Sequence, residues 1–196
     1  MQDALVVIDV FDDFDHEDGE ALLDCFRACV LVMEQAIASA RGAGVPVIYV
    51  NDLHGQWVAD APGLVRASLA KPASGSVLAP LAPEPGDRFL LKPRYSAFDH
   101  TPLVLLLREL ETERVVLVGA TTEGCVVQSG LDARELGFKV TILADACATT
   151  DPVLADLAVR YAEGVGGMRI SEADRWIRPL THGRGAAGDS RQHGAR

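Results

Sequence analysis

Short apolar runs and longer amphipathic segments alternate along most of the chain. The runs ALVVI at 4–8 and PVIYV at 46–50 are rich in β-branched residues and are bounded by polar or turn residues, which is typical of buried strands. Four more strands are predicted at 88–91, 115–118, 139–143 and 167–170. Between them, apolar residues recur every three or four positions, which predicts helices. The predicted helices cover 20–41, 64–69, 101–110, 125–136, 152–163 and 172–176.

This alternation predicts one α/β domain over residues 1–180. Strands that alternate with helices form a parallel sheet covered on both faces, so we expect a three-layer α/β/α Rossmann-like fold with a mainly parallel six-stranded sheet. The remaining stretch, THGRGAAGDSRQHGAR at 181–196, has almost no apolar content and is expected to be a disordered tail.

Composition narrows the classes of partner. The net charge of −10 over 196 residues argues against a nucleic acid or an anionic membrane as the partner. No uncharged apolar run approaches the roughly 18–20 residues that a membrane span needs. The four cysteines form no C-x-x-C pair and no export signal precedes the first strand, so we expect reduced thiols in the cytoplasm.

Polar residues that can support catalysis follow the predicted strands. Asp9 ends the first strand, Asn51 and Asp52 end the second, Lys92 ends the third, and the fourth leads to Cys125. The carboxyl ends of parallel strands share one edge of the sheet, where ligands bind in open α/β folds. A carboxylate, an ammonium and a thiol at this edge would supply a base, a cation and a nucleophile.

The stretch RVVLVGATTEGC at 114–125 places Cys125 in the first turn of a predicted helix. Free backbone N–H groups and the positive end of the helix dipole there favour the thiolate and can hold an oxyanion. The alternative is a small buried thiol without reactivity, which is common for free cysteines.

Sequence motifs for cofactors and metals are weak or missing. The chain contains no G-x-G-x-x-G after its first strand and no G-x-x-x-x-G-K-[ST]. Asp52 and His54 have the spacing of two metal ligands, but the next histidine is His100, so a third ligand is missing at a useful distance. We therefore expect no cofactor and no metal.

Four segments, in order, resemble the isochorismatase-like cysteine hydrolases. They are VVIDVFDDF at 6–14, VPVIYVND at 45–52, LKPRYSAFDHTPL at 91–103 and VLVGATTEGCV at 116–126. The resemblance implies a catalytic triad of Asp9, Lys92 and Cys125. It also implies a cis peptide between Ala120 and Thr121, and an oxyanion hole formed by the backbone amides of Thr121 and Cys125.

The same resemblance suggests the surroundings of the triad. Phe14 is expected to line the pocket or to pack in the core, and Trp57 to cover the pocket or to anchor its loop. The full set expected to contact substrate is Phe14, Asn51, Trp57, Tyr95 and Thr122. Homo-oligomers are usual in this family, and the apolar 101–110 helix leaves surface to bury, so a dimer or tetramer is expected.

The expected function is cysteine-dependent hydrolysis of a small amide, ureide or lactam through a thioester-type intermediate. TTEGCV resembles the turn of relatives that hydrolyse N-carbamoyl compounds and other small amides. Two alternatives stay open. One is vinyl-ether hydrolysis of an isochorismate-like substrate, which does not need the cysteine. The other is a non-catalytic binding protein on the same fold.

Overall fold

The computed structural model describes residues 1–182 except 56, 58 and 59. Its centre is a six-stranded sheet of order β3-β2-β1-β4-β5-β6 in which all paired strands are parallel, so the predicted fold class is confirmed. The strands are β1 (Asp3–Ile8), β2 (Val47–Asp52), β3 (Arg88–Lys92), β4 (Arg114–Gly119), β5 (Lys139–Cys147) and β6 (Arg169–Ser171).

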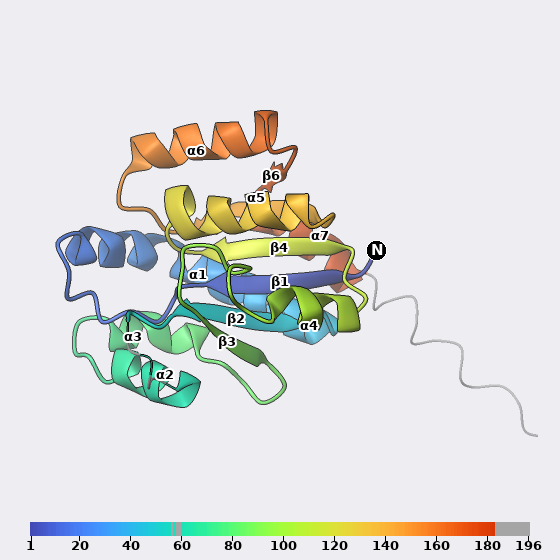
Figure 1. The fold of residues 1–196 in the computed structure, drawn as a ribbon. Coiled ribbons are helices and arrows are strands. Elements are labelled where there is room, and N and C mark those ends of the chain that lie inside the picture. Colours follow the sequence, from blue (N-terminus) through green and yellow to red (C-terminus); the bar gives the residue numbers. More distant parts are fainter. Residues whose placement is uncertain (56, 58–59, 183–196) are drawn as a thin grey trace, which may run out of the picture.

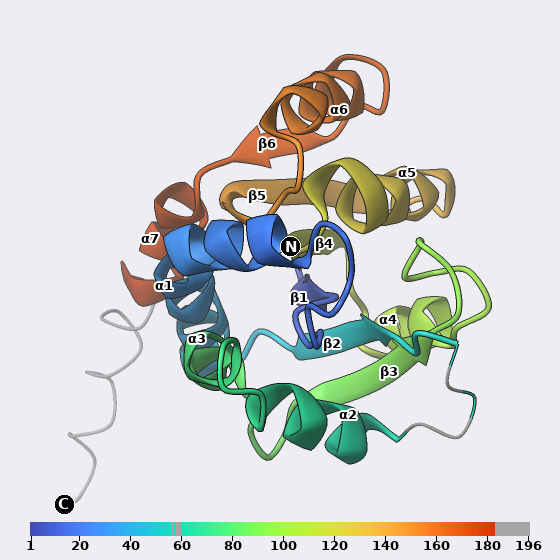
Figure 2. The ribbon, with the colours of Figure 1, turned by 90° about the vertical axis from the view of Figure 1, so that its left-hand side faces the viewer.

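Helices cover both faces of this sheet. Figure 2 shows α1 and α7 on one side and α4 and α5 on the other, with α6 next to α5. The helices are α1 (Gly19–Ala43), α2 (Ala61–Leu69), α3 (Gly75–Leu78), α4 (Leu103–Glu109), α5 (Val127–Glu135), α6 (Pro152–Gly164) and α7 (Ala173–His182). Two short turns complete the set: the 3₁₀ turn η1 (Ala79–Leu81) and the π-helical turn η2 (Thr122–Val126).

The alternation of side chains along β1 explains the three layers. Leu5 and Val7 pack with α1 on one face, whereas Val6 and Ile8 pack with α4 and α5 on the other. Every residue of β1 is buried, because both faces of a central parallel strand are covered.

The order of strands fixes where the polar strand ends meet. From β1 the chain moves outward to β2 and β3, then returns to the other side of β1 with β4. The strand order therefore reverses between β1 and β4, which is the switch point where ligands bind in such sheets. Figure 1 shows the carboxyl edge of the sheet at the left and the amino edge, with the N-terminus, at the right.

Helix α3 was not predicted and α2 begins three residues earlier than predicted, and three other differences have a clear structural cause. Strand β5 runs to Cys147 instead of Leu143, because the β4–β5 ladder shifts register between Leu117 and Gly119 and then pairs Gly119 with Cys147. Cys125 lies in the π-helical turn η2, and the regular helix α5 begins only at Val127. Helix α7 continues past the predicted end at Trp176 to His182, because it packs along α1.

The tail was predicted at 181–196, but residues 181 and 182 belong to α7, so its start was predicted two residues too early; residues 183–196 lie outside the described residues. Within the described part of the chain, no helix is both long enough and apolar enough to cross a membrane.

Candidate active site

Lys92 is the centre of the polar cluster at the carboxyl edge of the sheet. Its side chain is fully buried, and its Nζ lies 2.7 Å from Oδ2 of Asp9 and 3.5 Å from Sγ of Cys125. The same Nζ donates a 2.9 Å hydrogen bond to the carbonyl of Arg94 and lies 3.5 Å from Oδ2 of Asp52. The structure thus brings together the ends of β1, β2 and β3 and the turn after β4 around one ammonium group.

Asp9 is held in place by the backbone as well as by Lys92. It follows β1 with a left-handed φ of 49°, which Asp tolerates better than most residues because its short side chain can bond locally. Its amide donates to the carbonyl of Val50 at 3.0 Å, and its Oδ1 accepts the amide of Asp52 at 2.6 Å. Its Oδ2 is left to face Lys92, and its side chain is 16% exposed.

The turn after β4 brings Cys125 to the cluster. Gly119 has φ +121°, and a Cβ there would lie 1.9 Å from the carbonyl oxygen of Ile8, so only glycine fits. The following Ala120–Thr121 peptide bond is cis. Thr122 then fastens the turn to the end of β5, since its amide and its hydroxyl both donate to the carbonyl of Ala148, at 2.8 and 2.9 Å.

The ionisable groups of the cluster shift one another's pKa values. Burial raises the pKa of Asp9 above its ordinary value, although Lys92 opposes that change. Burial alone would lower the pKa of Lys92, but the charge of Asp9, followed by Cys125 and Asp52, raises it overall. Burial, and after it the charge of Asp9, raise the pKa of the Cys125 thiol to about 12.

In the structure, burial and the Asp9 carboxylate oppose the thiolate that the position of Cys125 in its turn favours. The sequence argument counted the helix end and the cation, which lower the pKa of a thiol, but not the burial of the sulfur or the neighbouring Asp9 carboxylate. Asp9 and Cys125 lie close enough for each to shift the pKa of the other. A carboxylate beside a protonated thiol is a base next to the proton that it could remove.

The turn that carries Cys125 closes around the carbonyl of Thr121. The amides of Gly124 and Val126 both donate to that carbonyl, at 3.2 and 3.1 Å. Backbone amides in a turn beside a nucleophile are groups that can hold a developing oxyanion.

Two of the residues expected to contact substrate have their polar groups occupied by the backbone. Asn51 is buried, and its side chain accepts from the Phe11 amide and donates to the Phe11 carbonyl, both at 2.9 Å. Thr122 is buried and bonded to Ala148 as described above. In the structure these two side chains hold the loops that carry Asp9 and Cys125.

The aromatic residues of that set divide into two kinds. Phe14 is half-buried and meets the ring of Phe26 in α1 edge to face, with centroids 5.8 Å apart, which agrees with the core alternative. Trp57 and Tyr95 are 79% and 73% exposed. Their side chains are free of the packing that fixes Phe14.

Glu123 stands two residues before the nucleophile, but its carboxylate is turned toward the end of β5. It accepts the hydroxyl of Thr149 at 2.7 Å and both the amide and the hydroxyl of Thr150, at 3.3 and 3.1 Å. These bonds tie the turn that carries Cys125 to the loop after β5.

Sequence reasoning missed two residues that position the cluster. Ser129 is fully buried; it donates to the carbonyl of Cys125 at 2.6 Å and accepts the amide of Ala97 at 2.8 Å. It thereby ties the nucleophile's turn to the loop after Lys92. Its place one helical turn after Cys125 was the available signal in the sequence.

Asp52 was noted at the end of its strand. That its carboxylate lies near Lys92, as a second carboxylate beside that of Asp9, could not be predicted from the spacing of the residues.

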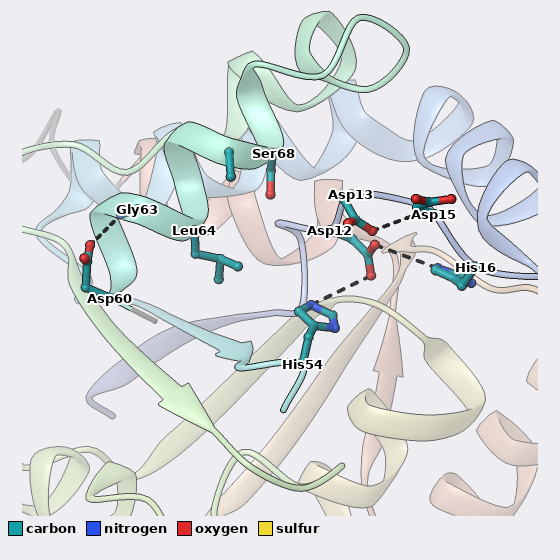
Figure 3. Close-up of a pocket in the computed structure, with 10 residues that line it drawn as sticks. Asp12, Asp13, Asp15, His16, His54, Asp60, Gly63, Leu64 and Ser68 are labelled. Atoms are coloured by element: carbon teal, nitrogen blue, oxygen red, sulfur yellow. Dashed lines mark hydrogen bonds and ion pairs between the residues drawn. The ribbon is translucent and has the colours of Figure 1, made fainter. Parts of the chain in front are cut away.

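A cavity of about 460 Å³ lies beside the cluster, between the loop after β1 and helix α2. Figure 3 shows Asp12 between two histidines, with His16 Nε2 at 3.8 Å and His54 Nε2 at 4.0 Å from its carboxylate oxygens. Within the described residues, no three His, Cys, Asp or Glu side chains are arranged to hold a metal ion. His54 and Asp52 are joined instead by a 2.6 Å bond from the His54 amide to Asp52 Oδ1.

The fold and the cluster define a class of protein: an α/β protein with a buried lysine linking an aspartate and a cysteine at its switch point. Residues 3–174 match the Isochorismatase domain. The chain is 30% identical over 174 residues to the isochorismatase family protein YaaI of Bacillus subtilis, with 89% of this chain and 96% of that protein covered. This protein belongs to the isochorismatase family.

Two further relatives carry names that describe a reaction. Ureidoacrylate amidohydrolase RutB of Pantoea ananatis is 28% identical over 208 residues, covering 93% of this chain and 80% of that protein. The crystal structure of N-carbamoylsarcosine amidase from Thermoplasma acidophilum superposes with a TM-score of 0.62 at 26% identity, covering 89% of this chain and 98% of that one. Both names denote hydrolases of C–N bonds.

Proposed function

We propose that this protein is a cysteine hydrolase that cleaves a non-peptide C–N bond in a small amide, ureide or lactam. The observation that carries the proposal is the contact of one buried ammonium, Lys92 Nζ, with both the Asp9 carboxylate and the Cys125 sulfur. The names of the two hydrolytic relatives support C–N chemistry.

The first half of the reaction uses all three side chains. Asp9 takes the proton from the Cys125 thiol as the sulfur attacks the carbonyl carbon, so that an S–C bond forms and the carbonyl oxygen becomes an anion. We expect that oxygen to be held by the backbone amides of Thr121 and Cys125. The C–N bond then breaks, and Asp9 returns the proton to the departing nitrogen, which leaves a thioester on Cys125.

The second half clears the thioester. Asp9 takes a proton from water, the hydroxide adds to the thioester carbonyl, and the C–S bond breaks as the proton passes to the sulfur. Lys92 stays charged throughout. Its role is to hold the Asp9 carboxylate and to stabilise the negative charge that moves between Asp9 and Cys125.

The test is a screen of amides, ureides and lactams with the wild type and Cys125→Ala, followed by mass spectrometry of the intact protein during turnover. We expect a substrate whose hydrolysis needs Cys125 and whose acyl group appears on that residue. Hydrolysis of a vinyl ether that survives Cys125→Ala would instead support the isochorismatase-type alternative. Binding of the compounds without turnover by either protein would support a non-catalytic binding protein.

Assembly into a homo-oligomer is part of the proposal. It is supported by bulky apolar side chains on the surface: Leu105 of α4 is 61% exposed, and Val153 and Leu157 of α6 are 73% and 58% exposed. Light scattering coupled to size exclusion would give the mass in solution. A mass equal to one chain at micromolar concentration would refute this part.

A further inference from the structure

Two cavities open at the opposite edge of the sheet, where β4, β5 and β6 begin. Their volumes are about 390 and 250 Å³, and they share Arg114, Thr141 and Arg169 as lining residues. In Figure 1 this is the edge marked by the N-terminus, far from the ends of the strands that carry Asp9 and Lys92. Nothing in the proposed hydrolysis uses these residues.

The sheet brings the three shared residues onto one face. Thr141 pairs with Arg169 on β6 and with Val116 on β4, two positions after Arg114. Val116 packs in the core on the α1 side, so the alternation along the strands places Arg114 and Thr141 on that face too. Helix α7 closes the larger cavity on that side with Arg175 and Trp176.

The charge of the lining is of one sign. In the described residues, no Asp or Glu side chain lines either cavity, although the chain as a whole carries a net charge of −10. All the ionisable side chains that line them are cationic: Arg114, Arg134, Lys139, Arg169 and Arg175. Such a concentration of positive charge in a concave site favours an anion.

One of these cations, Arg114, is already held in place by another residue before any ligand binds. Arg114 donates through Nε to Oδ1 of Asp3 at 2.9 Å and through Nη2 to Oδ2, and the indole of Trp176 donates to the same carboxylate at 2.9 Å. Arg114 Nη1 has no partner among the described residues. A guanidinium held on one side keeps its other edge ready for an oxyanion without a further loss of side-chain entropy.

Thr141 supplies an independent sign of a ligand. Its residue is 2% exposed, and its Oγ1 is buried without a hydrogen-bond partner in the described part of the chain. A buried hydroxyl that donates to nothing costs free energy, and such groups are rare in folded proteins. Thr141 lines both cavities beside its strand partner Arg169, and an oxyanion that reached this hydroxyl would accept its proton.

We propose that the amino edge of the sheet binds a phosphate group, free or carried on a small organic molecule, through Arg114, Thr141 and Arg169. Ile170, Pro179 and Leu180 border the larger cavity and would contact the organic part of a phosphate ester. This site is independent of the catalytic proposal and would stand even if the hydrolysis were disproved.

The test is isothermal titration with inorganic phosphate and with phenyl phosphate, at constant ionic strength in a buffer without oxyanions. The variants are Arg169→Gln and Thr141→Val. Each has a matched control: Arg160→Gln removes the same charge on α6, and Thr112→Val removes another buried hydroxyl that has no partner among the described residues but does not line these cavities.

We expect saturable binding to the wild type. Arg169→Gln should weaken it by roughly tenfold or more, and Thr141→Val by about three- to tenfold, whereas both controls keep the wild-type affinity. Tighter binding of phenyl phosphate would identify an ester as the ligand, and equal binding would identify free phosphate. The proposal would be overturned if neither anion binds the wild type saturably. It would also be overturned if the variants and their controls weaken anion binding equally.

Discussion

Each end of β1 carries an aspartate paired with a cation, and the two pairs are built differently. At the amino edge, Asp3 accepts two bonds from Arg114 and one from Trp176, so both carboxylate oxygens face hydrogen-bond donors. At the carboxyl edge, Asp9 meets Lys92 with one oxygen, and that ammonium also contacts the sulfur of Cys125.

The difference shows what makes an ion pair reactive. The Asp3 pair joins β1, β4 and α7, and among the described residues its bonds involve no thiol. The Asp9 pair includes a thiol, and burial raises the pKa of both Asp9 and Cys125. A higher pKa makes the Asp9 carboxylate a stronger base toward the neighbouring thiol, whereas a fully bonded carboxylate serves stability.

The largest effect on this comparison comes from removing the nucleophile. Cys125→Ala should lower kcat by about 10⁴-fold or more, because the other members of the triad act only through the sulfur. The matched control is Cys29→Ala, since burial also raises the pKa of the Cys29 thiol to about 12, but this thiol lies in α1, outside the Lys92 cluster. An equal loss of activity in both variants would mean that packing, not chemistry, is responsible.

Removing the base is the next test. Asp9→Asn keeps the size of the side chain but cannot accept the thiol proton, so kcat should fall by about 10²–10⁴-fold. Asp3→Asn makes the same change at the other end of β1 and should leave kcat of the folded protein within about twofold. Steady-state kinetics on the two variants, with circular dichroism to confirm folding, would decide between the roles.

The free energy of unfolding should depend more on Asp3 than on Asp9, the reverse of the order expected for kcat. Asp3→Asn leaves Arg114 without its carboxylate in a largely buried site, which should cost about 3 kcal/mol of unfolding free energy. The change is measured by urea unfolding, and Asp24→Asn on α1 is a control because its pair with Arg27 is largely exposed. A loss under about 1 kcal/mol for Asp3→Asn would place that pair with ordinary surface ion pairs.

The pH dependence follows from Asp9. The raised pKa means that folded Asp9 keeps its proton to a higher pH than in the unfolded chain, so its contribution to stability is full below the ordinary value of 3.8 and is lost as pH rises through the folded pKa. Activity changes in the opposite direction, because the base must be ionised. The acid limb of kcat/KM should lie above the ordinary carboxylate range, and a limb at 3.8 would contradict the assignment.

The smallest expected effect on kcat comes from Ser129, which positions Cys125. Ser129→Ala removes the hydroxyl that links the Cys125 carbonyl to the Ala97 amide, which should lower stability by about 1 kcal/mol and kcat several-fold with KM unchanged. A matched change is Ser171→Ala, whose hydroxyl donates to Glu172 at the surface. If both variants retain wild-type kcat, the link does not position the nucleophile.

The sequence was sufficient for the layers and for the group of residues at the strand ends. Strand ends could be predicted because β-branched apolar runs stop at Asp9, Asp52 and Lys92, and parallel strands must bring those ends to one edge. The register shift in β4–β5 could not be predicted, since it depends on the close approach of Gly119 to Ile8.

The protonation state of Cys125 was beyond the sequence for a similar reason. The position of Cys125 in its turn predicts a lowered pKa, but burial and the nearby Asp9 carboxylate, which depend on the tertiary structure, raise it. The roles of Asn51 and Thr122 depend on backbone carbonyls and amides far along the chain, at Phe11 and Ala148. Side-chain type alone does not distinguish a substrate contact from such a clamp.

The most direct test of the coupled cluster is the rate of Cys125 alkylation by iodoacetamide, a neutral reagent, against pH in the wild type and in Asp9→Asn. Mass spectrometry follows Cys125 and Cys29 separately. Burial and the Asp9 carboxylate raise the pKa of the Cys125 thiol. The rate of Cys125 alkylation in the wild type should therefore keep rising, by about tenfold per pH unit, even beyond pH 10. The Asp9→Asn protein should alkylate faster at Cys125 at every pH below this, although its hydrolysis collapses. An unchanged or slower rate at Cys125 in Asp9→Asn, or a wild-type rate that levels off near neutral pH, would contradict the account.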